Sequence, residues 1–202
     1  SQFSHLAIAS VYPQADGSLQ SSMVDQFIGP LVTAAHQQQK KVLLSVGGAG
    51  EGSRAFHQIM KNRHTAQVFI QNITAYALQH QLDGIDIDWE YWTYQHQLQK
   101  GGRDPVESQQ LIDLLRDLRA ALPKNMLLTT DIIAGDWLGA QYSSDIARHV
   151  DYVNLMAFDF TGGWPGSLIA HHADYATFVR AIKHTLAKGF PPEKLLVGLP
   201  AY

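Results

Sequence analysis

Short apolar stretches alternate with longer stretches of helical periodicity along this chain of 202 residues. Six of the apolar stretches have the length and residue content of buried strands, and they lie at residues 3–10, 41–46, 84–90, 127–133, 152–158 and 195–199. Four segments between them repeat apolar residues every three or four positions, which predicts helices at residues 22–39, 64–81, 104–122 and 173–188. This alternation predicts an α/β fold in which a parallel sheet is wound with helices.

The helix predicted at residues 104–122 has the best-marked start. Asp104 can cap its N-terminus, and Glu107, three residues later, completes a capping pattern. Residues 47–52 and 100–104 are rich in glycine and are predicted to be loops. No linker or low-complexity segment interrupts the pattern, so residues 1–202 are predicted to form a single domain.

Polar residues stand at the carboxyl ends of several predicted strands. Ser45, Asp88, Asp159 and Tyr202 each follow or end a different one. In a closed barrel of eight strand-helix units, the chemistry gathers at this end of the strands. An open nucleotide-binding sheet would instead need a glycine-rich phosphate loop after its first strand, and residues 12–17 do not form one. The pattern therefore favours a (β/α)8 barrel.

The strand at residues 84–90 carries acidic residues at every second position, namely Asp86, Asp88 and Glu90. Side chains two residues apart share one face of a strand and lie about 6.5 Å apart. Like charges at this distance in a cleft cannot all ionise freely, so at least one carboxyl is expected to keep its proton near neutral pH, as a general acid must. Asp83 has the opposite parity and is expected to fix the start of the strand through backbone hydrogen bonds.

Composition excludes several other classes of function. The apolar share of 46% and charged share of 16% are those of a globular domain, and the net charge of −3 provides no basic surface for nucleic acid. No apolar run approaches the roughly 20 residues of a membrane helix. The ten histidines are scattered, cysteine is absent, and isoleucines stand where a calcium loop needs turn residues, so no metal or other cofactor is expected.

These motifs resemble those of the family 18 glycoside hydrolases, the chitinases and their relatives, which are built on the (β/α)8 barrel. DGIDIDWE fits the pattern Asp-x-x-Asp-x-Asp-x-Glu, LLSVGG fits the Ser-x-Gly-Gly strand, and YVNLMAFD resembles the Met-x-Tyr-Asp strand. FSHLAIAS and LLVGLPAY resemble the second and seventh strands, and all five stand in family order. The segment at residues 154–164 is most similar to bacterial and fungal chitinases.

The resemblance implies a secreted enzyme that hydrolyses chitin or N-acetylglucosamine oligosaccharides with retention. The 2-acetamido oxygen of the substrate would attack the anomeric carbon. Glu90 would act as general acid and base, Asp88 would orient the acetamido group, and Asp86 would hydrogen-bond Asp88 and share its proton. Residues expected to bind or support the substrate are Ser45, Tyr91, Met156, Phe158, Asp159, Trp164 and Tyr202.

Some of these roles have alternatives. Met156 could equally fill the core, whereas Trp164 is favoured as a sugar-stacking ring. Trp92 and Tyr94 are expected to pack in a loop, and Asp131 and Asp136 receive no role. Alternative functions for the whole chain are a chitin-binding lectin without turnover and a glycosidase acting on peptidoglycan or N-glycans. The sequence sets no oligomeric state.

The chain departs from the family pattern in two ways. Phe158 stands where the family usually has tyrosine, so one hydrogen bond to the acetamido group would be missing and catalysis weakened. The six predicted strands match the second to the seventh of the barrel, and no segment matches the first or the eighth. The chain is therefore expected to be part of a longer barrel, with the strands at residues 3–10 and 195–199 flanking an open wedge.

Overall fold

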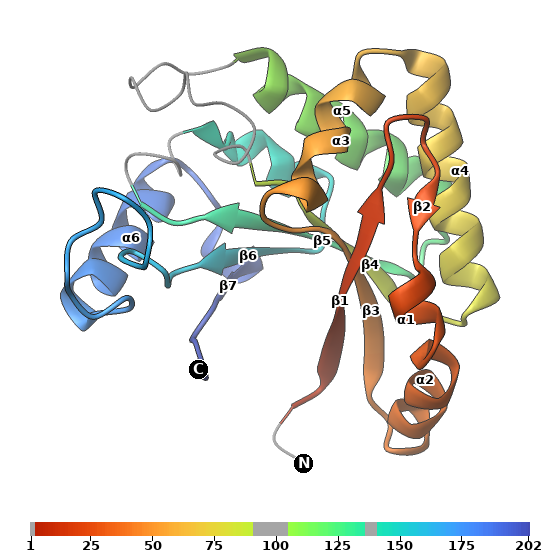
Figure 1. Cartoon of the computed structure of the whole chain (residues 1–202), viewed down its shortest axis with the longest axis horizontal. Helices are drawn as coiled ribbons and strands as arrows, with labels where there is room; N and C mark the ends of the chain where they lie inside the picture. Colours follow the sequence, from red (N-terminus) through yellow and green to blue (C-terminus); the bar gives the residue numbers. More distant parts are fainter. Residues whose placement is uncertain (1–2, 91–104, 136–140) are drawn as a thin grey trace.

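A computed structural model describes residues 3–90, 105–135 and 141–202. Within these ranges the strands form one curled sheet in the order β2-β1-β3-β4-β5-β6-β7 (Figure 1). All neighbouring strands are parallel except β2, which is antiparallel to β1. The strands are β1 (His5–Pro13), β2 (Leu19–Gln20), β3 (Lys41–Gly47), β4 (Gly84–Asp88), β5 (Leu127–Ile133), β6 (Tyr152–Met156) and β7 (Leu195–Val197). All six predicted strands are confirmed, and the short β2 was not predicted.

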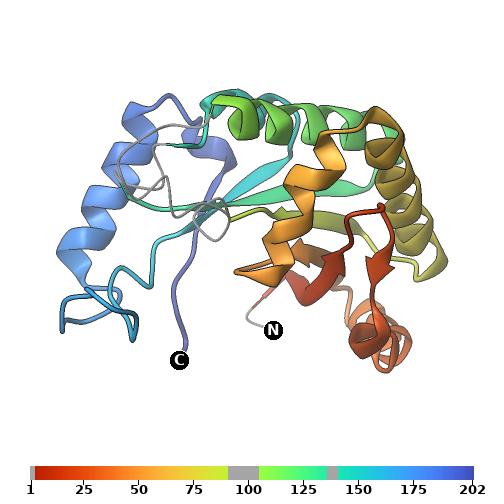
Figure 2. The same ribbon diagram turned by 45° about the horizontal axis from the view of Figure 1, so that its top comes forward.

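The helices lie mainly along one side of this sheet, while both termini lie on the other side (Figure 2). They are α1 (Ser22–Asp25), α2 (Ile28–Gln37), α3 (Glu51–Met60), α4 (Arg63–Gln79), α5 (Pro105–Ala121) and α6 (Tyr175–Ala187). Two short 3-10 helices span Ser144–Arg148 and Pro192–Lys194. No helix in the described ranges has both the length and the apolar character needed to cross a bilayer. The sheet and its outer helices are those of a partial α/β barrel, as the alternation of elements predicts.

One helix prediction and one loop prediction were wrong in detail. The helix expected at residues 22–39 is divided into α1 and α2. Pro30 explains the break, because proline is tolerated in the first turn of a helix but its ring would clash with the carbonyl of Gln26 in a continuous one. The loop expected at residues 47–52 ends at Gly50, and helix α3 begins at Glu51. Gly52 made this helix start hard to recognise, because glycine usually indicates a loop. Here the glycine is needed for close packing of the helix against Gly47.

The hydrophobic core between β4 and the helices fixes the direction in which the acidic residues of this segment point. Ile85, Ile87 and Trp89 are fully buried on the outer face of the chain at β4. The ring of Phe56 from α3 stacks on Trp89 at a centroid distance of 5.0 Å and an interplanar angle of 19°. Because side chains alternate along a strand, this packing turns the intervening acidic residues toward the inside of the curled sheet.

Two aspartates fix the amino-terminal ends of neighbouring strands in the same way. The Asp83 backbone N–H donates to the Val42 carbonyl at 2.8 Å, and the Asp83 carboxylate accepts the Val42 N–H at 2.8 Å. Asp151 makes the equivalent pair of bonds with Leu128, each also 2.8 Å long. The structural role expected for Asp83 is confirmed.

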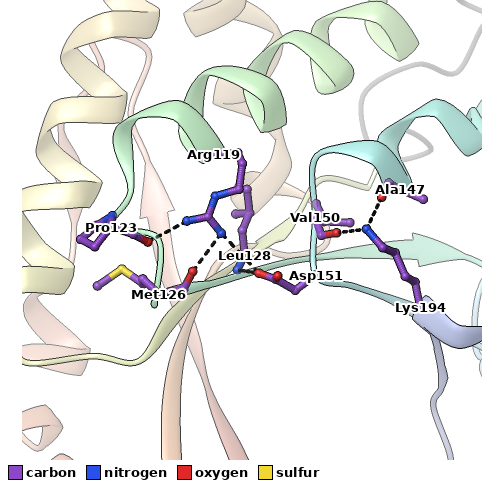
Figure 3. A network of polar contacts seen from close by, with 8 residues as sticks. All are labelled: Arg119, Pro123, Met126, Leu128, Ala147, Val150, Asp151 and Lys194. Atoms are coloured by element: carbon purple, nitrogen blue, oxygen red, sulfur yellow. Dashed lines mark hydrogen bonds and ion pairs between the residues drawn. The ribbon is translucent and has the colours of Figure 1, made fainter.

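Two cationic side chains bind backbone carbonyls at the same end of the sheet (Figure 3). The Arg119 guanidinium donates to the carbonyls of Pro123 and Met126 at 2.8 and 2.9 Å and contacts the Asp151 carboxylate at 3.3 Å. The Lys194 ammonium donates to the carbonyls of Ala147 and Val150 at 2.7 Å each. These bonds pair backbone carbonyls near the amino-terminal ends of the strands, so this end of the fold is built for stability.

One of the two edges of the sheet differs from the open edges expected. Strand β1 extends to Pro13, and its last two residues pair with β2 at Tyr12↔Gln20 and Pro13↔Leu19. One expected edge is therefore partly covered. At the other end, β7 pairs with β6, its one strand partner in the described part of the chain.

Candidate active site

Asp86 lies at the buried, inner end of the acidic row on β4. It is 2% exposed, and its carboxylate accepts hydrogen bonds from the Thr129 hydroxyl and, at 3.0 Å, from the Asn154 side-chain amide. Burial raises the pKa of Asp86. Hydrogen bonds from the neighbouring strands oppose this rise, and they come from Thr129, Asp131, Ser45 and Asn154. Its surroundings thus reduce the cost of ionising Asp86 in a dry interior.

Asp88 occupies the middle of the row and has a different environment. Its Oδ1 atom is buried and has no hydrogen-bond partner among the described residues. Burial, followed by the charges of Glu90 and Asp86, raises the pKa of Asp88 to about 8. Buried polar atoms are nearly always paired, so an unpaired carboxyl oxygen at this position is suited to a ligand group.

Glu90 is 9% exposed and is held through its backbone. Its N–H donates to the Ser53 hydroxyl at 2.7 Å, and that hydroxyl in turn donates to the Gly48 carbonyl at 2.8 Å. Ser53 is fully buried in the first turn of α3. Sequence reasoning missed Ser53, because the link spans 37 residues and the start of α3 was not recognised.

The loop after β3 packs directly against the acidic strand. Gly47 has a φ of +114°, and a Cβ atom there would lie 2.2 Å from the Asp88 carbonyl oxygen. The Gly48 N–H donates to the same oxygen at 2.8 Å. A Cβ at Gly52 would lie 2.3 Å from the Gly47 oxygen. The glycines of LLSVGG therefore allow a close approach of the two backbones beside Asp88.

Trp89 anchors the outer side of the same segment. Its indole N–H donates to the Glu107 carboxylate at 3.0 Å, and the Tyr142 hydroxyl donates to the Trp89 carbonyl at 2.9 Å. Glu107, Tyr142 and Trp89 are all buried. Glu107 was expected to form a helix cap with Asp104, which lies outside the described residues. In the structure Glu107 holds in place the segment that carries the carboxylates.

Strand β5 adds a fourth carboxyl to the site. Asp131 is two residues beyond Thr129, so the two side chains share the inner face of the sheet, and its register partner on β6 is Asn154. Burial, the charges of Asp86 and Asp88 and a hydrogen bond with Asp86 raise the pKa of Asp131 well above its usual range. The alternation of Thr129 and Asp131 along the strand was the available signal for this residue.

The arrangement suits proton transfer. Three carboxyls with different surroundings lie on β4 and just beyond its carboxyl end. Neighbouring carboxyls whose surroundings differ can take separate roles as acid and base. Within the described ranges, no group of three or more histidine, aspartate or glutamate side chains has the geometry to hold a metal ion.

The model of the Glycosyl hydrolases family 18 matches residues 1–202. The chain belongs to this family.

Several proteins similar to this family 18 chain are named chitinases. Over 171 residues, or 80% of the chain, it is 30% identical to "Probable chitinase 2" of Drosophila melanogaster. A chitinase structure from Bacteroides thetaiotaomicron is 28% identical with a TM-score of 0.81, and the Ostrinia furnacalis Group IV chitinase in complex with allosamidin is 26% identical with a TM-score of 0.80. Each of the two structural matches covers 98% of this chain.

This family 18 chain spans only part of those proteins. It covers 34% of the Drosophila relative, 59% of the Bacteroides structure and 57% of the Ostrinia structure. The shared barrel architecture therefore extends over the whole chain, whereas the relatives continue beyond the matched region.

Two of the expected site residues, Ser45 and Met156, lie on strands next to the acidic row or to its supporting residues. Ser45 is buried, is the register partner of Asp86 and hydrogen-bonds its carboxylate. Met156 is partly buried and shares the inner face of β6 with Asn154. The neighbours of Ser45 and Met156 are thus the acidic row and its supporting strand.

A second group of expected residues forms a cluster after β6. Phe158 meets the ring of Tyr202 edge-on at a centroid distance of 6.4 Å. The Tyr202 hydroxyl donates to the Asp159 carboxylate at 2.9 Å, and the His172 ring contacts the other carboxylate oxygen at 2.8 Å. Sequence reasoning missed His172, which contacts Asp159 from 13 positions further along the chain.

Of the remaining expected residues, Trp164 is exposed and Tyr91 lies outside the described residues. Trp164 is 44% exposed, and its ring lies over Gly162, where a Cβ atom would come within 2.0 Å of it. Tyr91 lies outside the described residues, as do Trp92, Tyr94, Asp104, Asp136 and the loop at residues 100–104.

Proposed function

We propose that the protein hydrolyses β-1,4-linked N-acetylglucosamine polymers and retains the anomeric configuration. The observation that supports this most directly is the environment of Asp88. Its buried Oδ1 has no hydrogen-bond partner among the described residues, and its pKa is raised to about 8. A neutral carboxyl is a poor nucleophile but a good hydrogen-bonding group, so the nucleophile would come from the substrate, as in family 18.

In this proposal Asp88 orients the 2-acetamido group for attack on the anomeric carbon. The amide N–H would reach the Asp88 oxygen that lacks a partner. A positive charge then develops on the oxazolinium ring, and an adjacent cation lowers the pKa of a carboxyl. Asp88 would pass its proton to the Asp86 carboxylate as the cation forms, so that a negative charge faces the oxazolinium ring, which stabilises the transition state more than the ground state.

Glu90 would donate a proton to the glycosidic oxygen and later accept one from the attacking water. It stands at the mouth end of the row, where the Ser53 hydroxyl fixes its backbone. Asp86, the register partner of Ser45, would share the proton of Asp88, ionised at the start of the reaction and protonated once Asp88 has released its proton. Phe158 supplies no hydroxyl for the acetamido group, so turnover would be weaker than with tyrosine at this position.

The aromatic and polar residues after β6 would contact the sugar chain. Met156 and Phe158 would lie beneath the sugar, Asp159 and Tyr202 would bind its polar groups, and Trp164 and Tyr91 would offer flat ring faces. Because chitin is an insoluble polymer, we also expect the protein to act outside the cell.

We further propose that residues 1–202 form most of one catalytic domain whose barrel is completed by other segments. Two observations support this. The structural matches span 98% of this chain but only 57–59% of the two similar chitinase chains. Strand β7 pairs with β6 and has no second strand partner in the described part of the chain.

The test is the release of soluble oligosaccharides by the whole protein, measured in parallel on chitin and on a glycoprotein with N-glycans. Soluble N-acetylglucosamine oligomers from chitin alone are expected. Release from the glycoprotein alone would assign the N-glycan activity instead. Binding to chitin without any release would identify a lectin-like protein and contradict the proposed hydrolysis.

A further inference from the structure

Asp131 is a carboxyl inside the site that the family motif leaves without a role. It belongs to β5, whereas the motif residues Asp86, Asp88 and Glu90 belong to β4 and its end. On the register of the sheet, Thr129 is the partner of Asp86. Asp131 follows two residues later on the same face, one step nearer the mouth of the barrel.

The contacts of Asp131 lead to the inner end of the acidic row. Its carboxyl shares a hydrogen bond with Asp86. Asn154, its register partner, donates to the Asp86 carboxylate at 3.0 Å and also interacts with Asp131. Two ionised carboxylates have no proton to share, so one member of the Asp86–Asp131 pair must be neutral.

The surroundings decide which member holds the proton. Asp86 accepts further bonds from Thr129, Ser45 and Asn154, all of which favour its ionised form. Asp131 faces the charges of Asp86 and Asp88 on β4, while its neighbour on β6, Asn154, is uncharged. These surroundings favour Asp131 as the member that holds the proton.

We propose that Asp131 is a positioning residue for the hydrolysis proposed above, on which this inference rests: as a neutral acid it donates a hydrogen bond to Asp86 and keeps that carboxylate ionised beside Asp88. The charge of Asp86 is one of the causes that raise the pKa of Asp88. Asp131 thus acts on Asp88 through Asp86 and helps Asp88 to begin the reaction in its protonated form.

The first test compares Asp131→Asn with Asp131→Leu in the whole protein. The asparagine amide can still donate to Asp86, so kcat on an N-acetylglucosamine oligomer should stay within about threefold of wild type. Leucine cannot donate, so kcat should fall about tenfold with KM little changed, and the alkaline limb of the kcat/KM profile should move to lower pH. Equal losses in both variants, or an unmoved profile in Asp131→Leu, would overturn the proposal.

Thr130→Val is the matched control. Thr130 is buried on the opposite face of β5 and donates a hydrogen bond to the Ile87 carbonyl at 2.7 Å. Its loss should lower stability but leave the pH profile in place. In an Asp86→Ala background, Asp131→Leu should cause no further loss of kcat, because its effect passes through Asp86. A further tenfold loss there would contradict the assigned route.

Infrared difference spectroscopy decides the protonation of Asp131 without any turnover. The spectrum of wild type minus Asp131→Asn at pH 7 should contain the carbonyl band of a protonated carboxylic acid. A carboxylate band in its place would show that Asp131 is ionised and would overturn the inference. Since this measurement needs no substrate, its outcome is separate from the success or failure of the proposed hydrolysis.

Discussion

The Ser53 hydroxyl accepts the backbone N–H of Glu90 at a distance of 2.7 Å. This bond joins the first turn of α3 to the end of the acidic strand. The same hydroxyl donates to the Gly48 carbonyl, so one buried side chain connects the glycine loop after β3 with the proposed general acid. The position of Glu90 therefore depends on a contact outside the family motif.

Replacing Ser53 with alanine should affect both stability and turnover. The Glu90 N–H and the Gly48 carbonyl would lose a buried partner, which costs about 1–3 kcal/mol of unfolding free energy. A displaced Glu90 should also lower kcat by roughly tenfold. Chemical denaturation and steady-state kinetics on a chito-oligosaccharide measure the two effects.

Lys194→Met is the control for Ser53→Ala. It removes the two hydrogen bonds to the Ala147 and Val150 carbonyls at the opposite end of the strands. Stability should fall by a similar amount while kcat of the folded protein stays unchanged. If kcat fell equally in both variants, Ser53 would have only a general effect on stability.

Glu90→Gln tests the proposed general acid. Glutamine keeps the shape of the side chain but cannot supply the proton, so kcat should fall by at least ~10² while binding of an N-acetylglucosamine oligomer is retained. Turnover and isothermal titration on the same preparation check both parts. Turnover near the wild-type level would remove Glu90 from its assigned role.

The raised pKa of Asp88 predicts how stability changes with pH. In the folded protein this group keeps its proton up to about pH 8, whereas in the unfolded chain it ionises near pH 3.9. The folded state binds more protons between these values, so the unfolding free energy should fall as pH rises through this window, by up to about 1.4 kcal/mol per pH unit. Denaturation curves from pH 4 to 8 should be less pH-dependent for Asp88→Asn. An equal slope in both proteins would contradict the assignment of the proton to Asp88.

The proposed open barrel predicts low stability for residues 1–202 in isolation. Strand β7 would leave its outer edge unpaired, and apolar residues of the interior would lack neighbours. A domain with a margin of about 5–15 kcal/mol can hardly absorb both losses. Thermal unfolding and size-exclusion chromatography should show association or a broad transition. A monomer that melts cooperatively above about 60 °C would show that these residues suffice.

The sequence was sufficient to predict the features that depend on local periodicity. Alternation along β4 placed Ile85 and Ile87 in the core and Asp86 and Asp88 on the other face, and the structure has this arrangement. The strand order followed because parallel strands joined by helices have few possible connections. Asp83 is out of step with the acidic row, and this position predicted its structural role of binding the backbone at the start of the strand.

Features that depend on register between distant segments could not be predicted in this way. The contact of Asp131 with Asp86 requires the alignment of β5 with β4, and the bond from Glu90 to Ser53 requires the start of α3. Glycine-rich segments such as that before Ser53 predict loops by composition, even where close packing is the reason for the glycines. Helix α3 was missed for this reason.

The central claim is that the acetamido group of the substrate is the nucleophile, and digestion of partially deacetylated chitin tests it most directly. Mass spectrometry of the products identifies the sugar at each newly formed reducing end. Because only an N-acetylated sugar can attack its own anomeric carbon, every new reducing end should be N-acetylglucosamine. New reducing ends that carry glucosamine would contradict the account, since the enzyme would then have to supply the nucleophile itself.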